Sequence, residues 1–216
     1  MSVITISRQC GSGGDEIARF ITQSLDYRYF DKNLMAQVAS QIGYPQEKVV
    51  DFPETNYRTR GFFERLLDNP RIIAEIETWQ PNTAGAQRIT VAELDEQQCI
   101  QLVQSCIYAA AQLDRVIILG RGGQAVLKDQ PGVLHVRVEA PLAKRIMRIQ
   151  ETENLSLSAA KEWALTHDKF AAAYLKRFYH LDWSDPLHYH LVLNTGHWEI
   201  KTAAQLVISA LNHLNQ

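Results

Sequence analysis

The stretch that decides the fold is Val3-Ile4-Thr5-Ile6-Ser7-Arg8-Gln9-Cys10-Gly11-Ser12-Gly13-Gly14. Its first four residues form a short β-branched run, which predicts a buried strand. Apolar residues recur at helical spacing over residues 15–25, directly after the glycines. A glycine-rich turn between a strand and a helix lets backbone N–H groups approach an anion, and the helix N-terminus adds its dipole. We therefore expect a backbone cradle for phosphate at residues 8–14, where the Ser12 hydroxyl could also reach phosphate or Mg²⁺.

The loop departs from the common phosphate-loop pattern GxxxxGK[ST]. Aligned on Gly13, the pattern places its first glycine on Arg8 and its lysine on Gly14. Its Ser/Thr falls on Asp15. Two other interpretations stay open: a plain glycine turn, and a dinucleotide-binding turn in which Glu16 takes the place of the third glycine of G-x-G-x-x-G.

A second glycine-rich turn, Gly120-Arg121-Gly122-Gly123, follows the apolar run at residues 116–119. With Gln124-Ala125 it matches part of the same dinucleotide pattern. The helix after it is expected to be short, because Lys128-Asp129-Gln130-Pro131 follows closely. This turn is the second candidate for a dinucleotide-binding loop.

Strands alternate with helices along most of the chain. We expect further strands at residues 28–31, 116–119, 133–138 and 189–194. We expect further helices at residues 33–42, 91–113, 142–150 and 158–179, and one that ends near residue 214. This rhythm predicts an α/β fold with a mainly parallel sheet that helices cover on both faces.

Residues 43–90 break this rhythm. Prolines and glycines punctuate the stretch, and short amphipathic pieces lie between them. The prolines are Pro45, Pro53, Pro70 and Pro81. We interpret the stretch as a helical insert within a single domain that spans residues 1–216, a length that suits one core with an inserted subdomain.

Composition limits the partners and the compartment. The formal net charge of −2 gives no global attraction to nucleic acid or to an anionic membrane, so neither is expected as a partner. The first six residues lack the basic region of a signal peptide, and three cysteines without CxxC spacing fit a reducing compartment, so we expect a cytoplasmic protein. His188 and His190 share a strand face without a third ligand, and no protein-held metal is expected. Cys10 lies near a helix N-terminus, which favours a lowered thiol pKa.

Phosphoryl transfer needs cations and fixed geometry around a charged transition state. Arg8 flanks the loop and is our first candidate to replace the missing lysine, by bidentate contact with phosphate; the alternative is a salt bridge at the strand end. Arg121 follows a strand at the carboxyl edge of the sheet, where ligands of such sheets bind, and is a candidate for the acceptor phosphate. Asp31 could bind a ribose hydroxyl or cap the next helix. Arg58 and Arg60 in the insert could hold the acceptor, although isolated surface arginines are common.

Two later helices carry further basic residues. Lys144, Arg145 and Arg148 lie on one helix, where Lys144 and Arg148 are i, i+4 neighbours that share a face. One or two of the three could reach ATP, and the alternative is a solvated basic surface. Lys169 and Lys176 share a face of the following helix, and Arg177 is rotated from them. These residues are the remaining candidates for contact with a nucleotide.

Several short motifs occur in a fixed order along nearly the whole chain. They are Ile6-Ser7-Arg8-Gln9 with Gly11-Ser12-Gly13-Gly14, Tyr29-Phe30-Asp31, Val116-Ile117-Ile118-Leu119-Gly120-Arg121, Val136-Arg137-Val138-Glu139-Ala140-Pro141, and Trp183-Ser184-Asp185-Pro186 followed by Tyr189 and Leu193-Asn194. From residue 3 to about 196 the chain thereby resembles the cytidylate-kinase-like family of bacterial P-loop proteins. The resemblance implies a P-loop NTPase-like three-layer α/β/α fold with a five-stranded, mainly parallel sheet. It also implies an insert that binds the nucleoside monophosphate (NMP) and a lid at about residues 150–180.

The family's activity is phosphoryl transfer from ATP to CMP or a similar acceptor. The resemblance therefore implies nucleotides as partners, ATP as cofactor, Mg²⁺ held mainly by nucleotide and water, and a monomer or homodimer. Together with the residues above, it implies catalytic roles for Arg8, Arg121 and Arg148. It implies nucleotide binding by Gly11, Ser12, Gly13, Gly14, Asp15, Lys169 and Arg177. It implies acceptor binding by Asp31, Arg58, Arg60 and Arg121.

Departures from the family pattern support other interpretations. Gly14 stands where nucleotide kinases carry lysine, and Asp15 stands where members of this family often carry arginine. Phe170 and Ala171 occupy lid positions where positive charge is expected. The alternative is a nucleotide-binding or regulatory module that kept the fold and lost the chemistry. A third hypothesis is a kinase for a different small acceptor.

Overall fold

The computed structural model describes residues 2–30, 34–35, 37–38, 74–81, 87–94 and 96–214. The chain divides into two compact units, one formed by Met1–Phe30 with Ala111–Gln216 and the other by Asp31–Ala110. The phosphate loop, the later strands and the predicted lid all belong to the first unit. The interpretation of the whole chain as one domain stays a prediction.

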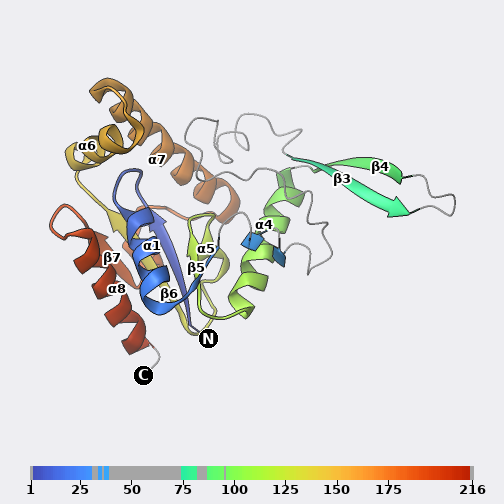
Figure 1. Cartoon of the computed structure of the whole chain (residues 1–216), viewed down its shortest axis with the longest axis horizontal. Coiled ribbons are helices and arrows are strands. Elements are labelled where there is room, and N and C mark those ends of the chain that lie inside the picture. Colours follow the sequence, from blue (N-terminus) through green and yellow to red (C-terminus); the bar gives the residue numbers. More distant parts are fainter. Residues whose placement is uncertain are drawn as a thin grey trace. The chain divides into compact units, whose positions relative to one another are not determined.

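A five-stranded sheet forms the centre of the first unit, in the order β2-β5-β1-β6-β7 (Figure 1). The strands are β1 (Val3–Arg8), β2 (Arg28–Tyr29), β5 (Val116–Leu119), β6 (Val133–Glu139) and β7 (Leu191–Asn194). Every neighbouring pair is parallel, and Ile4 is in register with Ile117 on one side and Leu134 on the other. The predicted α/β fold with a parallel sheet is confirmed, and β1 lies at its centre.

Helices cover both faces of this sheet. On one face, α1 (Gly14–Leu25) and α8 (Ile200–Leu214) pack side by side, and Ile21 and Val207 join the fully buried core that contains Ile4 and Ile117 (Figure 1). On the other face lies the four-residue helix α5 (Gly123–Val126). A Cβ added to Gly123 would lie 3.0 Å from Ile118, so glycine lets this short helix approach the sheet closely. The predicted shortness of this helix is confirmed.

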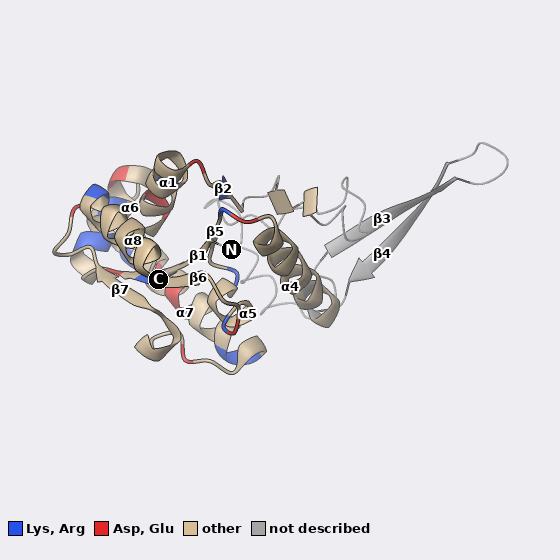
Figure 2. Ribbon diagram, turned by 90° about the horizontal axis from the view of Figure 1, so that it is seen from below, with Lys and Arg blue, Asp and Glu red and all other residues tan. Residues whose placement is uncertain are grey.

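Two further helices follow β6. They are α6 (Leu142–Glu153) and α7 (Leu157–Tyr179), which pack against each other and carry charges of both signs (Figure 2). The prediction of both helices is confirmed, although α6 extends three residues beyond its predicted end. None of the helices in the described part of the chain is long and apolar enough to span a membrane.

Two strands are shorter than predicted. The strand expected at residues 28–31 contains only Arg28–Tyr29, and Asp31 lies outside the described residues. The strand expected from Tyr189 begins at Leu191. The reason is a 3₁₀ turn at Pro186–His188, begun by a proline that fixes a helical φ and followed by Tyr189 as its C-terminal cap.

The described part of the second unit corrects the prediction of a purely helical insert. Strands β3 (Ala74–Pro81) and β4 (Gln87–Leu94) form an antiparallel pair in which Ala74 is opposite Leu94. The helix predicted from residue 91 begins only at Glu96, as α4 (Glu96–Gln112). The run Ile89-Thr90-Val91 consists of β-branched residues, which favour a strand over a helix. The rest of the predicted insert lies outside the described residues.

Candidate functional site

The loop after β1 adopts a conformation that needs its glycines. Gly11 and Gly13 have φ angles of 74° and 87°, in the left-handed region that side chains rarely adopt. A Cβ on Gly11 would lie 2.7 Å from the carbonyl oxygen of Arg145, and one on Gly13 would collide with Ile200. Gly13 is also the N-cap of α1, so the first N–H groups of that helix have no acceptor within the helix. The loop is thus a backbone cradle at the centre of the carboxyl edge of the sheet.

Ser12 is the buried polar residue of this cradle. It is fully buried, and among the residues that the structure describes its Oγ has no hydrogen-bond partner. Its backbone is fixed at both ends, because the N–H donates to the carbonyl of Gln9 and the carbonyl accepts from the hydroxyl of Thr195. An unsatisfied buried hydroxyl is costly and calls for an explanation. A phosphate oxygen or a Mg²⁺ ion would supply the missing partner, so the residues present fit a Mg²⁺–nucleotide.

Arg8 and Asp15 lie across the loop from each other. Nε and Nη2 of Arg8 each donate to the Asp15 carboxylate over 3.3 Å, and both side chains are largely shielded. A Cβ on Gly14 would lie 2.5 Å from Cβ of Arg8 and 2.8 Å from its Cγ. The Arg8 side chain therefore fills the space next to Gly14 that the lysine of the common pattern would enter. The structure thus contains the strand-end salt bridge that was the alternative interpretation of Arg8, and it also brings Arg8 to the lysine position.

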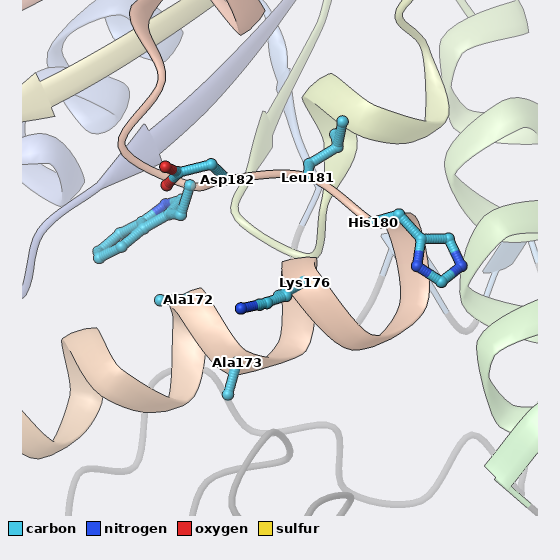
Figure 3. A pocket seen from close by; sticks show the side chains of 7 residues that line it. Ala172, Ala173, Lys176, His180, Leu181 and Asp182 are labelled. Carbon is cyan, nitrogen blue, oxygen red and sulfur yellow. The ribbon is translucent and has the colours of Figure 1, made fainter.

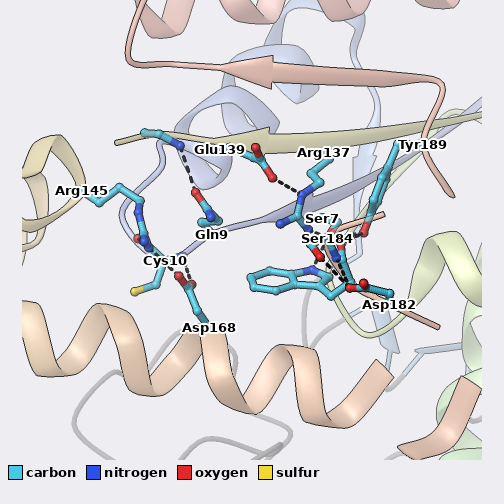
Figure 4. A network of polar contacts seen from close by, with 12 residues as sticks. Ser7, Gln9, Cys10, Arg137, Glu139, Arg145, Asp168, Asp182, Ser184 and Tyr189 are labelled. Carbon is cyan, nitrogen blue, oxygen red and sulfur yellow. Dashed lines mark hydrogen bonds and ion pairs between the residues drawn. The ribbon is translucent and has the colours of Figure 1, made fainter. Parts of the chain in front are cut away.

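A buried ion pair fastens the loop to α6 and α7 (Figure 4). Nη1 of Arg145 donates to Asp168 over 2.7 Å and to the carbonyl of Cys10 over 3.0 Å. The other oxygen of Asp168 accepts the N–H of Cys10 at 2.9 Å. Arg145 was among the basic residues of this helix that the sequence offered as candidates, but its pairing with Asp168 was not predicted. The i, i+4 spacing of Arg145 and buried Ile149 could have indicated that Arg145 faces the interior, but it gives no sign of the partner.

Cys10 does not have the lowered pKa that its place near a helix N-terminus favours. Burial, helped by the nearby carboxylate of Asp168, raises the pKa of the thiol to about 12. The thiol is therefore protonated and unreactive at neutral pH. Desolvation and the neighbouring negative charge outweigh the helix dipole at this position.

Arg148, three residues after Arg145 on α6, also contacts the loop. Its Nη1 donates to the hydroxyl of Thr195 over 2.9 Å and to the carbonyl of Gly11 over 3.4 Å, and its Nη2 donates to the carbonyl of Thr195. Lys144 donates to the carbonyl of Gly196. Arg148 therefore lies at the loop, and both side chains fasten α6 to the segment after β7. A catalytic role of Arg148 stays a prediction.

Arg121 lies at the carboxyl end of β5. Arg121 is buried, with 4% of its surface exposed. Its Nη1 donates to the carbonyl of Phe30 over 3.0 Å, and its guanidinium lies over the Phe30 ring. The position at the sheet edge agrees with the prediction. A role with an acceptor phosphate stays a prediction.

A second buried arginine, Arg137, organises the segment before β7 (Figure 4). It contacts the carboxylate of Glu139, donates to the carbonyl of Trp183 over 2.6 Å, and stacks on the Trp183 ring with 4.4 Å between guanidinium carbon and ring centroid. The indole N–H of Trp183 donates to the hydroxyl of Ser7 over 2.7 Å, and Tyr189 donates to the same carbonyl as Arg137. Trp183 is thus a packing anchor of this segment, and Arg137 was missed because it lies within an apolar strand.

Trp183 also forms one wall of a pocket beside α7 (Figure 3). The pocket has a volume of about 450 Å³. Its other walls are Ala172, Ala173 and Lys176 of α7 and the segment His180-Leu181-Asp182. Lys176 and Asp182 therefore line a space of nucleotide size, and the Asp182 carboxylate also accepts hydrogen bonds from Ser184. Because Trp183 is bonded to Ser7, the pocket is connected to the end of β1 from which the phosphate loop starts.

The other predicted site residues are two residues of α7 and three residues of the second unit. Lys169 and Arg177 are exposed on α7, and Arg177 stands over the ring of Phe178. Asp31, Arg58 and Arg60 lie outside the described residues. Within the residues that the structure describes, no three His, Cys, Asp or Glu side chains are grouped so that they could hold a metal ion.

Comparison with known proteins adds to this geometry. A model of the cytidylate kinase-like family matches residues 3–197. The chain is 22% identical to the cytidylate kinase of Thermococcus kodakarensis over 214 residues, which cover 99% of this chain and 89% of that protein. It is 26% identical to the cytidylate kinase of Methanoregula boonei over 108 residues, which cover 50% of this chain and 58% of that protein. It is also 33% identical to the uronate isomerase of Corynebacterium glutamicum over 95 residues, which cover 44% of this chain and only 18% of that protein.

Two solved structures share the fold. One is that of an uncharacterized protein from Eubacterium ventriosum, with a TM-score of 0.64, 15% identity and coverage of 98% of this chain and 99% of that one. The other is shikimate kinase from Bacteroides thetaiotaomicron, with a TM-score of 0.50, 10% identity and coverage of 98% of each chain. These likenesses confirm the P-loop kinase fold.

Proposed function

Because the chain belongs to the cytidylate kinase-like family, we propose that it transfers the γ-phosphoryl group of ATP to a nucleoside monophosphate, with CMP or a close analogue as acceptor. The observation that carries the proposal is the loop after β1. It combines glycines whose Cβ positions are blocked with a buried Ser12 hydroxyl that has no hydrogen-bond partner in the described part of the chain. Such a cradle suits phosphate oxygens, which accept hydrogen bonds from backbone N–H groups.

On the donor side, the first-turn N–H groups of α1 and the hydroxyl of Ser12 would bind the phosphates of ATP. Arg8 would supply the charge that lysine supplies elsewhere, because its side chain fills the space beside Gly14. A guanidinium can contact two phosphate oxygens at once, which suits this exchange. Mg²⁺, when bound with the nucleotide, would neutralise phosphate charge and orient the transferring group. Arg148 and Arg145 are positioning residues in this proposal, since their described contacts hold the loop backbone.

On the acceptor side, we propose the pocket beside Trp183. Lys176 offers a positive charge for a phosphate, and Asp182 offers an acceptor for amino or hydroxyl groups of a nucleoside. The bond between Trp183 and Ser7 connects this pocket to the strand that precedes the loop. Arg121 stays the candidate for the acceptor phosphate at the same sheet edge. The sparse cysteines support the cytoplasm as the place of action.

A coupled assay of ADP formation tests the proposal. Purified protein is supplied with Mg²⁺–ATP and, in turn, CMP, dCMP, UMP, AMP and GMP. We expect turnover with at least one cytidine nucleotide. In Arg8→Ala we expect the turnover rate to fall at least about a hundredfold, which is the order of one electrostatic contact in a transition state. In Arg19→Ala we expect the wild-type rate. Arg19 is the matched control, because it is an exposed arginine on α1. If no acceptor gives turnover above that of Arg8→Ala while calorimetry detects nucleotide binding, the alternative of a nucleotide-binding module replaces the kinase.

A further inference from the structure

Asp15 is the residue of the loop that a phosphate-binding role does not explain. It stands in the first turn of α1, directly after the glycine cradle, at the position where the common pattern carries a Ser or Thr. In that pattern the hydroxyl at this position binds the Mg²⁺ of the nucleotide. A carboxylate at the same position brings negative charge towards the place where the phosphates of a nucleotide would lie.

The geometry of the pair with Arg8 leaves Asp15 able to bind a cation. The carboxylate accepts two hydrogen bonds from Arg8, each 3.3 Å long, which is at the weak end of the range for charged pairs. A carboxylate has about four lone-pair sites, so about two stay available. Its side chain is 22% exposed, so it is shielded but accessible.

We propose that Asp15 is a ligand of Mg²⁺, directly or through one water, and that nucleotide phosphates bind to this loop together with the ion. The inference rests on the proposed function, since it assumes that the loop holds a nucleotide. Mg²⁺ is characteristically held in proteins by one or two carboxylates and by substrate phosphates. An ion between the Asp15 carboxylate and the phosphates turns a repulsive contact into two attractive ones.

Two neighbouring features support this assignment. The orphan hydroxyl of Ser12 lies in the same cradle and provides a second hard oxygen of the kind that Mg²⁺ prefers. Arg8 is held by Asp15, so a phosphate without the ion has to compete with that carboxylate for the guanidinium. When the ion is bound to Asp15, it balances the charge of the carboxylate, and the guanidinium of Arg8 can turn towards the phosphate. Asp15 thereby makes binding conditional on the divalent cation.

A plainer role for Asp15 is stabilisation of the N-terminus of α1, where acidic side chains interact favourably with the helix dipole. Glu16 occupies the same turn and is exposed, so it offers the same dipole interaction with no contact to Arg8 among the described hydrogen bonds. A purely structural role predicts that Asp15→Asn and Glu16→Gln change thermal stability and leave the effect of Mg²⁺ on nucleotide affinity unaltered. Glu16→Gln is therefore the matched control.

Isothermal titration calorimetry with ATP, in Mg²⁺ and in EDTA, tests the inference in wild type, Asp15→Asn and Glu16→Gln. We expect the dissociation constant in EDTA divided by that in Mg²⁺ to be at least about tenfold smaller in Asp15→Asn than in wild type, a difference equal to about 1.4 kcal/mol. The fall comes chiefly from tighter binding without the ion. Glu16→Gln keeps the wild-type ratio. Electron paramagnetic resonance of Mn²⁺ in the protein–ADP complex gives a second readout, in which Asp15→Asn binds the ion at least about tenfold more weakly.

Three results overturn the inference. An unchanged ratio in Asp15→Asn shows that the carboxylate does not bind the ion. Equally tighter binding in Mg²⁺ and in EDTA shows that Asp15 acts only as a competing charge for Arg8. Absence of nucleotide binding by folded wild-type protein under both conditions removes the proposed function as well, so the two failures are distinguishable.

Discussion

Restoring the lysine of the common pattern is expected to harm this protein. In Gly14→Lys the new Cβ would lie 2.5 Å from Cβ of Arg8. Ordinary carbon–carbon contacts are about 3.5–4.0 Å, so the overlap is about 1 Å. Overpacking of this kind costs about 1–3 kcal/mol of stability. In a chain of 216 residues each kcal/mol lowers Tm by about 2–4 °C, so we expect a decrease of about 2–12 °C.

Differential scanning calorimetry on four proteins tests this expectation: wild type, Gly14→Lys, Arg8→Gly and the exchange variant Arg8→Gly/Gly14→Lys. If Arg8 fills the lysine space, Arg8→Gly removes the clash, and the double-mutant cycle gives a favourable coupling of about 1 kcal/mol or more. Gly14→Ala isolates the steric part, since it adds only the Cβ. We expect the exchange variant to regain more nucleotide affinity than either single variant.

Two results refute this reasoning. A neutral Gly14→Ala shows that the helix start and Arg8 separate without cost, so the space is not shared. Higher nucleotide affinity in Gly14→Lys with Arg8 still present shows that both cations can bind the nucleotide together. In that case the presence of Arg8 does not explain why position 14 is a glycine.

Three further predictions concern the surroundings of the loop. Burial, followed by the nearby charge of His190, lowers the pKa of His135 from 6.5 to about 4, so between these pH values the unfolded chain binds a proton that the folded chain does not. We expect the free energy of unfolding, measured in urea, to decrease by about 3 kcal/mol from pH 7 to pH 4, and this pH dependence to disappear in His135→Gln. Asp168→Asn breaks the shielded pair with the α6 arginine and is expected to cost about 3 kcal/mol in urea unfolding, against less than about 0.5 kcal/mol for Asp129→Asn in an exposed pair. Thr195→Val removes a hydroxyl that donates to the loop, and calorimetric unfolding is expected to show a loss of about 1–2 kcal/mol, whereas an unchanged Tm would exclude this contact.

The sheet and the loop could be predicted because their signals are local. Strand Val3–Arg8 begins with four β-branched residues, and a glycine cluster starts three residues after it. Val116–Leu119 is a continuous apolar run that a glycine turn follows, so the apolar pattern and the glycines were sufficient. The strands of the second unit could not be predicted, because Gln87–Leu94 lies among prolines, glycines and short amphipathic segments. Its β-branched core was the available signal, and the prolines and glycines around it obscured that signal.

The contacts of the site depend on residues far apart in sequence. Arg8 could be placed at the loop from its position, but its relation to Gly14 follows from the close approach of α1 to β1. The pair between Arg145 and Asp168 joins two helices and fixes Cys10, and neither spacing nor composition shows it. The pKa of the Cys10 thiol was predicted in the wrong direction, because burial is a tertiary property.

The measurement that tests the central claim most directly is a crystal structure of the protein with Mn²⁺ and a non-hydrolysable ATP analogue. We predict phosphate oxygens against the N–H groups of Gly11, Gly13 and Gly14 and within hydrogen-bond distance of the Ser12 hydroxyl. We also predict that the Arg8 guanidinium turns towards the phosphates. Anomalous scattering would place Mn²⁺ next to Asp15. A nucleotide bound elsewhere, with this loop holding only solvent, would contradict the claim that the loop is the phosphate site.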